Sequence, residues 1–89
     1  MCKAVYVSLD IDVLEAAFCS GTGTLDFGGI LPRDLLKLLK FVTKPGKCGM
    51  DIVEVSPPFD VDDITSLAAS CCIANVLCNS ALNNSFYKF

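Results

Sequence analysis

The sequence predicts an α/β fold in which two parallel strands alternate with two helices, in the order strand, helix, strand, helix. Two apolar segments rich in β-branched residues, 4–9 and 50–55, have the length and composition of strands. Each is followed by a segment with helical character, residues 33–42 and 64–82. A helix between two strands indicates a parallel pair with a right-handed crossover. Doubly buried parallel strands need neighbours and helices on both faces, so the chain is expected to form part of a larger sheet.

The first strand, residues 4–9, is expected to be buried on both sides and to end in two carboxylates, Asp10 and Asp12. If both aspartates continue the strand, they point to the same face, because side chains alternate with period two. The carboxyl end of a strand is where open α/β sheets bind ligands. Paired carboxylates there repel each other unless a cation such as a divalent metal lies between them. An equal alternative is a pair of capping or turn aspartates.

Residues 19–29 form a loop that holds four of the six glycines, including Gly21-Thr22-Gly23-Thr24. A glycine-rich loop is expected to lie close to another part of the structure or to a ligand. The loop lacks the Gly-Lys-[Ser/Thr] ending of a P-loop, so its backbone amides alone are a weak anion-binding signal. Pro32 suits the first turn of the next helix, whose leucines form a broad apolar face.

The second strand is predicted at residues 50–55, after a turn at residues 43–49. Glu54 lies near its carboxyl end, either as a carboxylate that recognises a cation or as a polar residue leaving the strand. Asp60, Asp62 and Asp63 are expected to cap the last helix and to make its first turn acidic. That helix is expected to pack in the core through small residues, because polar side chains dilute it as a membrane span. Residues 83–89 are expected to be a flexible tail.

The composition excludes some classes of function. The net charge of −3 disfavours nucleic acid as a partner. The six cysteines are interpreted as reduced thiols, because no signal peptide precedes the first strand and three of them lie in the apolar helix. An intracellular protein, cytoplasmic or mitochondrial, is therefore expected. Zinc is disfavoured, since the chain has no histidine and no CxxC pair.

Three segments in this order resemble the ureohydrolase family, which comprises arginases, agmatinases and their relatives. They are residues 8–14 (SLDIDVL), the loop of residues 21–29, and residues 51–60 (DIVEVSPPFD). Linked motifs are more specific than any one alone. The resemblance covers residues 5–77 and corresponds to the C-terminal third of the family, most like agmatinases. It implies that residues 1–89 are a single partial domain, a fragment of a three-layer α/β/α parallel-sheet sandwich.

The resemblance also implies a binuclear manganese site and hydrolysis of a guanidino compound to urea and an amine. Asp10 would bridge both metals and Asp12 would bind one of them. Glu54 would pair with the substrate guanidinium, and Thr24 would lie beside it. No catalytic residue beyond the metal ligands is implied. Agmatine is preferred over arginine, and full-length members are expected to be homo-oligomers acting on small molecules, with no membrane partner.

The sequence departs from this family in ways that bear on activity. The Gly-Gly-Asp-His and Asp-Ala-His-x-Asp motifs are not among these 89 residues, so only two of six metal ligands are present. Glu15-Ala16 and Cys19-Ser20 stand where the family has Asp-Pro and Ala-Pro, and a third proline is lost between Leu25 and Phe27. Fewer prolines should loosen the loop. The chain alone is therefore expected to be an inactive fragment or truncated product.

Two alternatives accompany this interpretation. The first is a non-catalytic remnant that associates with a full-length ureohydrolase through an exposed sheet edge and apolar surface. The second is a haloacid dehalogenase-like phosphatase with Asp10 as nucleophile, although the fifth position of the DxDx[TV] motif is Leu14.

Overall fold

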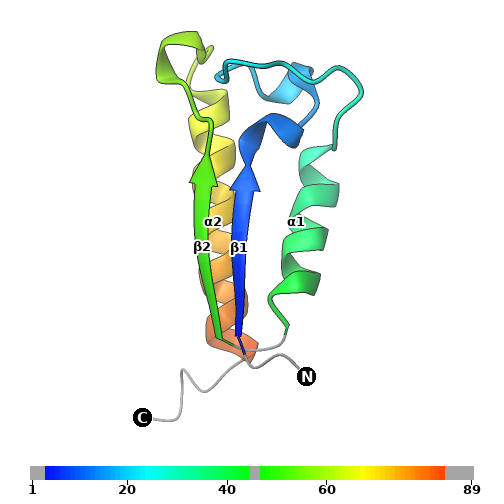
Figure 1. The fold of residues 1–89 in the computed structure, drawn as a ribbon, viewed down its shortest axis with the longest axis vertical. Helices are drawn as coiled ribbons and strands as arrows, with labels where there is room; N and C mark the ends of the chain where they lie inside the picture. The colour runs from blue at the N-terminus through cyan, green and yellow to red at the C-terminus, as the bar shows by residue number, and fades with distance from the viewer. Residues whose placement is uncertain (1–3, 45–46, 84–89) are drawn as a thin grey trace.

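The computed structural model describes residues 4–44 and 47–83, and it confirms the order of the four main elements (Figure 1). Strand β1 (Ala4–Asp10) pairs in parallel with strand β2 (Lys47–Val53). Helix α1 (Pro32–Val42) connects the two strands, and helix α2 (Ile64–Asn83) follows β2. The register places Asp10 opposite Val53, so both strands end at the same level.

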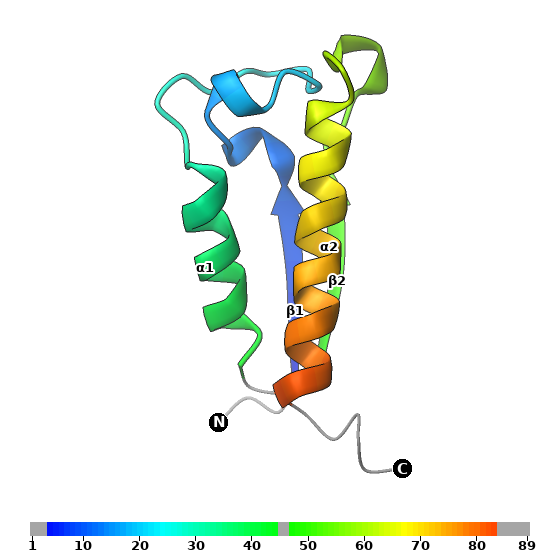
Figure 2. The ribbon, with the colours of Figure 1, turned by 180° about the vertical axis from the view of Figure 1, so that it is seen from behind.

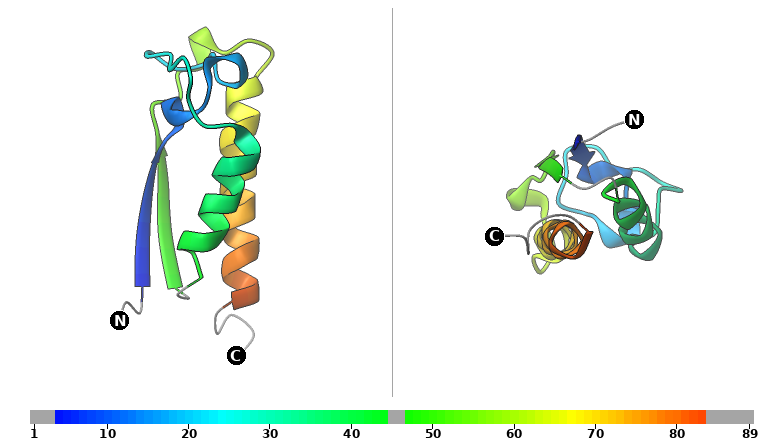
Figure 3. Two further views of the ribbon diagram at one scale, coloured as in Figure 1. Left: turned by 90° about the vertical axis from the view of Figure 1, so that its right-hand side faces the viewer. Right: turned by 90° about the horizontal axis from the view of Figure 1, so that it is seen from below.

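Both helices lie on the same face of the sheet (Figure 3). Val5, Val7 and Leu9 of β1 are more buried than their neighbours, whereas Tyr6 and Ser8 are exposed. The expectation that β1 is buried on both sides is therefore wrong for the described residues, which form two layers. The strand alternates between buried and exposed positions because only one of its faces is packed against helices.

The core lies between the sheet and the helices. In α1, Leu35 and Leu39 are one helical turn apart and both are almost fully buried, while Lys37 and Lys40 are exposed as expected. The core therefore follows from helical periodicity on one side and strand alternation on the other. Its other buried apolar members are Leu9, Ile11, Leu14, Cys19, Ala69, Cys72 and Val76.

Strand β2 begins earlier and ends earlier than the sequence predicted. The predicted turn included Gly49, but Gly49 pairs with Tyr6 inside the ladder. A Cβ at Gly49 would lie 2.9 Å from the Cδ2 atom of Tyr6, so the absence of a side chain permits this pairing. Glu54 lies beyond the strand, with a left-handed φ of 73°. Residues 45–46 of the predicted turn lie outside the described residues.

The cap of α2 differs in part from the prediction. Asp60 accepts hydrogen bonds from the backbone N–H groups of Thr65 at 2.8 Å and Ser66 at 2.9 Å, which confirms its capping role. Asp62 and Asp63 do not form an acidic first turn. They occupy left-handed conformations with φ of 54° and 59° immediately before the helix. In the predicted tail, residue 83 belongs to α2, and residues 84–89 lie outside the described residues.

Helix α2 is only partly a core helix. One face, formed by Thr65, Ala69, Cys72 and Val76, is buried. Its segment Ile64–Leu82 is long and apolar enough to cross a membrane, with a mean hydropathy of 1.4, and about a fifth of it is buried. Length and composition alone are weak grounds for a membrane span, because core helices pass the same test. The five cysteines in the described part of the chain are free thiols, as expected.

Candidate functional site

Asp10 and Asp12 lie at the carboxyl end of β1, but only Asp10 belongs to the strand. Residues Ile11–Val13 form a 3₁₀ turn, and the Asp10 Oδ1 atom accepts a hydrogen bond from the Asp12 backbone N–H at 3.1 Å. The prediction that both side chains share a strand face is therefore wrong for Asp12. Asp10 does act as a cap, and the turn brings the second carboxylate back toward the first.

Three other carboxylates lie near enough to Asp12 to affect its pKa. Desolvation, a hydrogen bond with Asp10, and repulsion by Asp10, Glu54 and Asp26 raise the pKa of Asp12. The structure thus brings together the three predicted acids and adds Asp26, which the sequence marked only as part of a departure in the loop. A concentration of negative charge at the strand ends favours a cationic ligand.

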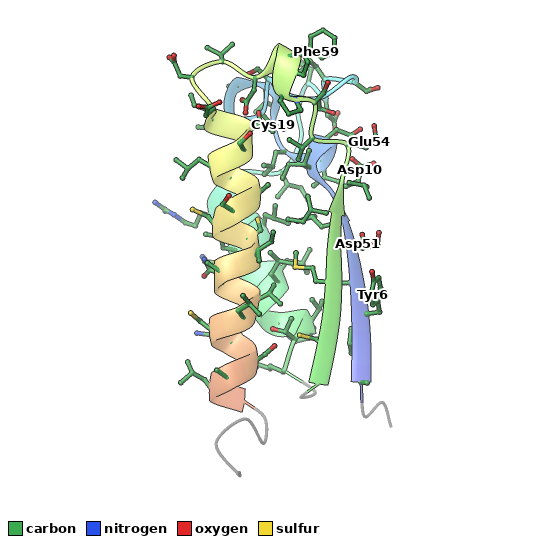
Figure 4. The ribbon with its side chains drawn as sticks, turned by 90° about the vertical axis from the view of Figure 1, so that its left-hand side faces the viewer. Tyr6, Asp10, Cys19, Asp51, Glu54 and Phe59 are labelled. Atoms are coloured by element: carbon green, nitrogen blue, oxygen red, sulfur yellow. The ribbon has the colours of Figure 1, made fainter. Side chains whose placement is uncertain are left out.

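Glu54 follows β2 directly and is exposed. Its φ of 73° places a non-glycine residue in the left-handed region, which costs free energy that the surrounding structure must offset. Figure 4 shows Glu54 and Asp10 at the same end of the two strands. The unusual backbone turns the chain away from the ladder where the carboxylates gather.

The glycine-threonine loop, residues 21–24, is hydrogen-bonded to the connection between β2 and α2. The Ser56 backbone N–H donates to the Gly21 carbonyl at 2.6 Å, and the Gly21 N–H donates to Thr65 Oγ1 at 2.7 Å. The Val61 N–H donates to Ser20 Oγ at 3.1 Å. A Cβ at Gly21 would lie 2.8 Å from Asp60 Cβ, so only glycine fits there. Two segments more than 30 residues apart in sequence therefore hold one another at the strand ends.

The other end of the loop is held by Glu15, a residue that the sequence marked only as a departure from the family. Its Oε1 atom accepts hydrogen bonds from the N–H groups of Gly28 at 2.6 Å and Gly29 at 3.2 Å. Cys19 is buried and its thiol donates to the Ile11 carbonyl at 3.3 Å. Side-chain hydrogen bonds thus anchor this loop near positions where the resembled family has prolines.

Thr24 is exposed, and its side chain has no hydrogen-bond partner within residues 4–44 and 47–83. Its place beside a guanidino group therefore stays a prediction. Thr22, two residues earlier, is 4% exposed, and its Oγ1 atom lacks a partner in the described part of the chain. The motif drew attention to both threonines, but only the fold distinguishes the buried one from the exposed one.

The carboxylates of Asp10 and Asp12 have the right chemistry to bind a hard divalent cation, but they are too few to complete a metal site. Asp10 and Asp12 offer the oxygen ligands that Mn²⁺ accepts. Among the described residues, however, no three His, Cys, Asp or Glu side chains are arranged to hold a metal ion. The two aspartates are thus fit to form part of a metal site and do not complete one.

Comparisons with known proteins point to one family. The model of the arginase family matches residues 1–78. Agmatinase from Cronobacter sakazakii is 50% identical over 66 residues, covering 74% of this chain and 22% of the relative. The mitochondrial guanidino acid hydrolase of Homo sapiens is 38% identical over 76 residues, covering 85% and 22%. The solved structure of proclavaminate amidino hydrolase from Streptomyces clavuligerus superposes with a TM-score of 0.80 at 46% identity, covering 85% and 25%. The chain thus spans about a fifth of its curated relatives.

Proposed function

The chain belongs to the arginase family of ureohydrolases, and on this basis we propose that Asp10, Asp12 and Glu54 form part of a site for hydrolysis of a guanidino compound. The family resemblance and the arginase-like α/β fold are both confirmed. Membership favours C–N bond hydrolysis over the phosphatase alternative. The observation that carries the proposal is the placement of Asp10 and Glu54 at the same end of the paired strands, with Asp12 in the turn that Asp10 caps.

Asp10 and Asp12 are the side chains that would hold manganese. When bound, the metal lowers the pKa of water, so that hydroxide is available near neutral pH. The chain's own contribution is to orient the two carboxylates through the 3₁₀ turn after β1. Because like charges raise the pKa of Asp12, a bound cation is favoured by relieving their repulsion.

Glu54 is proposed to pair with the guanidinium group of the substrate. A carboxylate and a guanidinium form two parallel charge-assisted hydrogen bonds, which fix the orientation of the carbon to be attacked. The exposed position of Glu54 leaves its carboxylate free to receive a ligand, and its left-handed backbone is of the kind found at functional sites. Thr24, in the loop that follows β1, is proposed to contact the same group.

Agmatine is the proposed substrate of the whole protein, with a role in polyamine metabolism. The negative charges of Asp10, Asp12 and Glu54 at the strand ends would attract the dication agmatine and repel the carboxylate of arginine. Saturation-transfer NMR with each compound tests this preference on the purified chain. A stronger signal from agmatine supports it, and a stronger signal from arginine contradicts it.

Two carboxylates do not define a binuclear site, so we propose that the 89 residues alone release no urea. The test is a urea assay with manganese and agmatine, in which no release above background is expected. Urea release by this chain that is lost in Asp10→Ala would contradict the proposal.

Manganese binding tests the site separately from turnover. We expect weak binding, detected by the loss of the free Mn²⁺ electron paramagnetic resonance signal, that disappears in Asp12→Asn. Asp34→Asn on α1 is the matched control, because it removes one negative charge away from the site. Equal loss of binding in both variants would show nonspecific attraction and would contradict the assignment.

We further propose an intracellular location, since the human relative is named as mitochondrial and the other named relatives are bacterial enzymes.

A non-catalytic remnant that binds a full-length ureohydrolase is the second candidate function. The sheet face carrying Tyr6 and Ser8, which no described element covers, favours it. Co-expression with a full-length relative tests it, and failure to co-purify would count against it.

A further inference from the structure

An open groove with a basic lining runs between α1 and α2, which lie side by side on one face of the sheet (Figure 2). Among the described residues, no acid lines this groove, and Asp34, the acidic residue of α1, lines a different cavity. We call it the basic groove. Its volume is about 570 Å³, and its lining residues are Arg33, Leu36, Lys37, Lys40, Asn75 and Asn79.

The three cations of the groove form one stripe along α1. Arg33, Lys37 and Lys40 are spaced by four and three residues, so they share one side of the helix over about 10 Å of its length. Like charges at this spacing repel each other and destabilise a helix. Arg33 also lies in the first turn, where the helix dipole favours a negative charge. The stability of α1 therefore does not account for the stripe, whereas a bound anion would relieve its repulsion.

Helix α2 lines the groove with neutral hydrogen-bond donors. Asn75 and Asn79 are one helical turn apart, and both line the groove. Asn75 donates one amide N–H to the Cys71 carbonyl at 2.9 Å, which leaves its second N–H available to a ligand. The helix contains no charged residue from Ile64 to Asn83, so it supplies no carboxylate to neutralise the three cations.

The remainder of an arginase-family domain leaves this groove open. In an α/β/α sandwich the helices form the two outer layers. Missing strands extend the sheet at its edges, and missing helices pack on its open face or beside α1 and α2. Because α1 and α2 are already neighbours, the outward side of the groove between them stays accessible to solvent. Arg33, Lys37, Lys40 and Asn75 are all exposed here.

We propose that the basic groove binds a soluble oligophosphate, an anion of two or more linked phosphate groups. A guanidinium such as that of Arg33 matches two phosphate oxygens at once, and lysines bind phosphate as point charges. A single phosphate would leave part of the stripe without a counter-charge. The net charge of −3 disfavours a long polyanion such as nucleic acid, whereas a short anion contacts only the groove.

Isothermal titration calorimetry of the full chain with inorganic tripolyphosphate tests the proposal. Tripolyphosphate is expected to bind at least about tenfold more tightly than orthophosphate, because it neutralises more of the stripe. The affinity should fall as sodium chloride is raised, since the groove is open to solvent. In a proton–nitrogen correlation NMR spectrum, the shifts on binding should map to residues 33–40, Asn75 and Asn79.

Two lysine variants separate the groove from the charge of the whole chain. Lys37→Gln removes the central cation and should weaken tripolyphosphate binding at least about fivefold. Lys44→Gln makes the same change of charge at an exposed residue outside the groove, and it should bind like the parent chain. Tripolyphosphate should accordingly raise the thermal midpoint of the parent chain and of Lys44→Gln more than that of Lys37→Gln. Lys37→Gln is expected to fold, because glutamine is about as good a helix former as lysine.

Several outcomes would overturn the proposal, and none of them bears on guanidino hydrolysis, because the groove shares no residue with the proposed site. They are no binding of tripolyphosphate, equal affinity for orthophosphate, and equal weakening by the two lysine variants. NMR shifts confined to residues outside the groove would also overturn it. So would tighter binding of an acidic peptide or of anionic lipid vesicles than of tripolyphosphate.

Discussion

Asp12 shows at the scale of one residue how a site conflicts with the stability of the chain that carries it. Its pKa is raised by desolvation and by neighbouring acids, so its charged form is disfavoured in the folded state. When the pKa of a carboxyl group is higher in the folded state than in the unfolded state, the group stabilises the fold at pH values below its unfolded-state pKa. This stabilisation is lost as the pH rises through its folded-state pKa.

Asp12→Asn is therefore expected to raise the thermal midpoint at pH 7, because it removes an unfavourable charge, while Asp34→Asn should lower it slightly. Asp34 lies in the first turn of α1, where a negative charge is favourable. Circular dichroism melting of the three proteins provides the measurement. A lower midpoint for Asp12→Asn would mean that the carboxylate stabilises the folded chain.

Asp51 shows the opposite shift on the open face of the sheet, where Figure 4 places it beside Tyr6. Tyr6 Oη and Ser8 Oγ each donate a hydrogen bond to its carboxylate at 2.7 Å and lower the pKa of Asp51 below its ordinary 3.8. This contribution to stability is present above the unfolded pKa and is lost as pH falls through the folded one.

Tyr6→Phe is expected to raise the pKa of Asp51, measured by NMR titration of its carboxyl carbon. Asp60 serves as the internal reference. Desolvation raises its pKa, but hydrogen bonds from Thr65 and Ser66 outweigh desolvation and lower it. Those bonds do not involve Tyr6, so the Asp60 value should not move. An unchanged Asp51 titration would show that the hydrogen bond from Tyr6 does not form in solution.

At the scale of elements, Gly21 and Gly23 of the glycine-threonine loop allow a matched test of how the loop packs against α2. Gly21→Ala places a Cβ 2.8 Å from Asp60 Cβ and 2.9 Å from Thr65 Cβ, and we expect it to cost about 1–3 kcal/mol of unfolding free energy. Gly23→Ala meets nothing within 4 Å and should be nearly neutral. Urea unfolding of both variants checks the difference, and equal midpoints would mean that the loop is not held against α2.

Thr65 tests the same contact from the helix side. It is fully buried, and Thr65→Val keeps its shape but removes the acceptor for the Gly21 N–H, which should cost about 1–3 kcal/mol. Ser70→Ala is the control, because its hydroxyl is exposed and bonds only within α2. Similar unfolding midpoints for the two variants would argue that water replaces the lost partner.

The elements also show which parts of the structure a sequence can predict. Periodicity located α1 and α2 almost to the residue, because helical contacts are local. The limits of β2 were wrong because they depend on pairing with β1, more than 40 residues away, which draws Gly49 into the ladder. The predicted position of Asp12 was wrong for a local reason, because Asp10 caps the 3₁₀ turn and β1 therefore ends before Asp12. Asp26 and Glu15 were missed because their roles arise only when the loop folds back.

At the scale of the whole molecule, the described residues form one helical layer on a two-stranded sheet. A larger arginase-family domain would place strands and helices on the surfaces that remain exposed here, and the chain corresponds to about a fifth of such a relative. Among the described residues, Phe27 and Phe41 are large apolar side chains that lie on the surface, 95% and 66% exposed. A chain this small therefore depends on few core residues for its stability.

Leu39 should decide whether the whole chain folds. It is 2% exposed between α1 and the sheet, and replacing a buried leucine by alanine costs about 2–5 kcal/mol. Folded proteins are stable by roughly 0.05–0.15 kcal/mol per residue, so Leu39→Ala should remove a large part of the stability of this chain and lower its thermal midpoint strongly. Leu38→Ala changes the adjacent residue, which is 49% exposed, and should leave the helical circular dichroism signal intact. If Leu39→Ala kept a cooperative melt near that of the parent chain, the contacts that bury Leu39 between α1 and the sheet would contribute little to the stability of the fold.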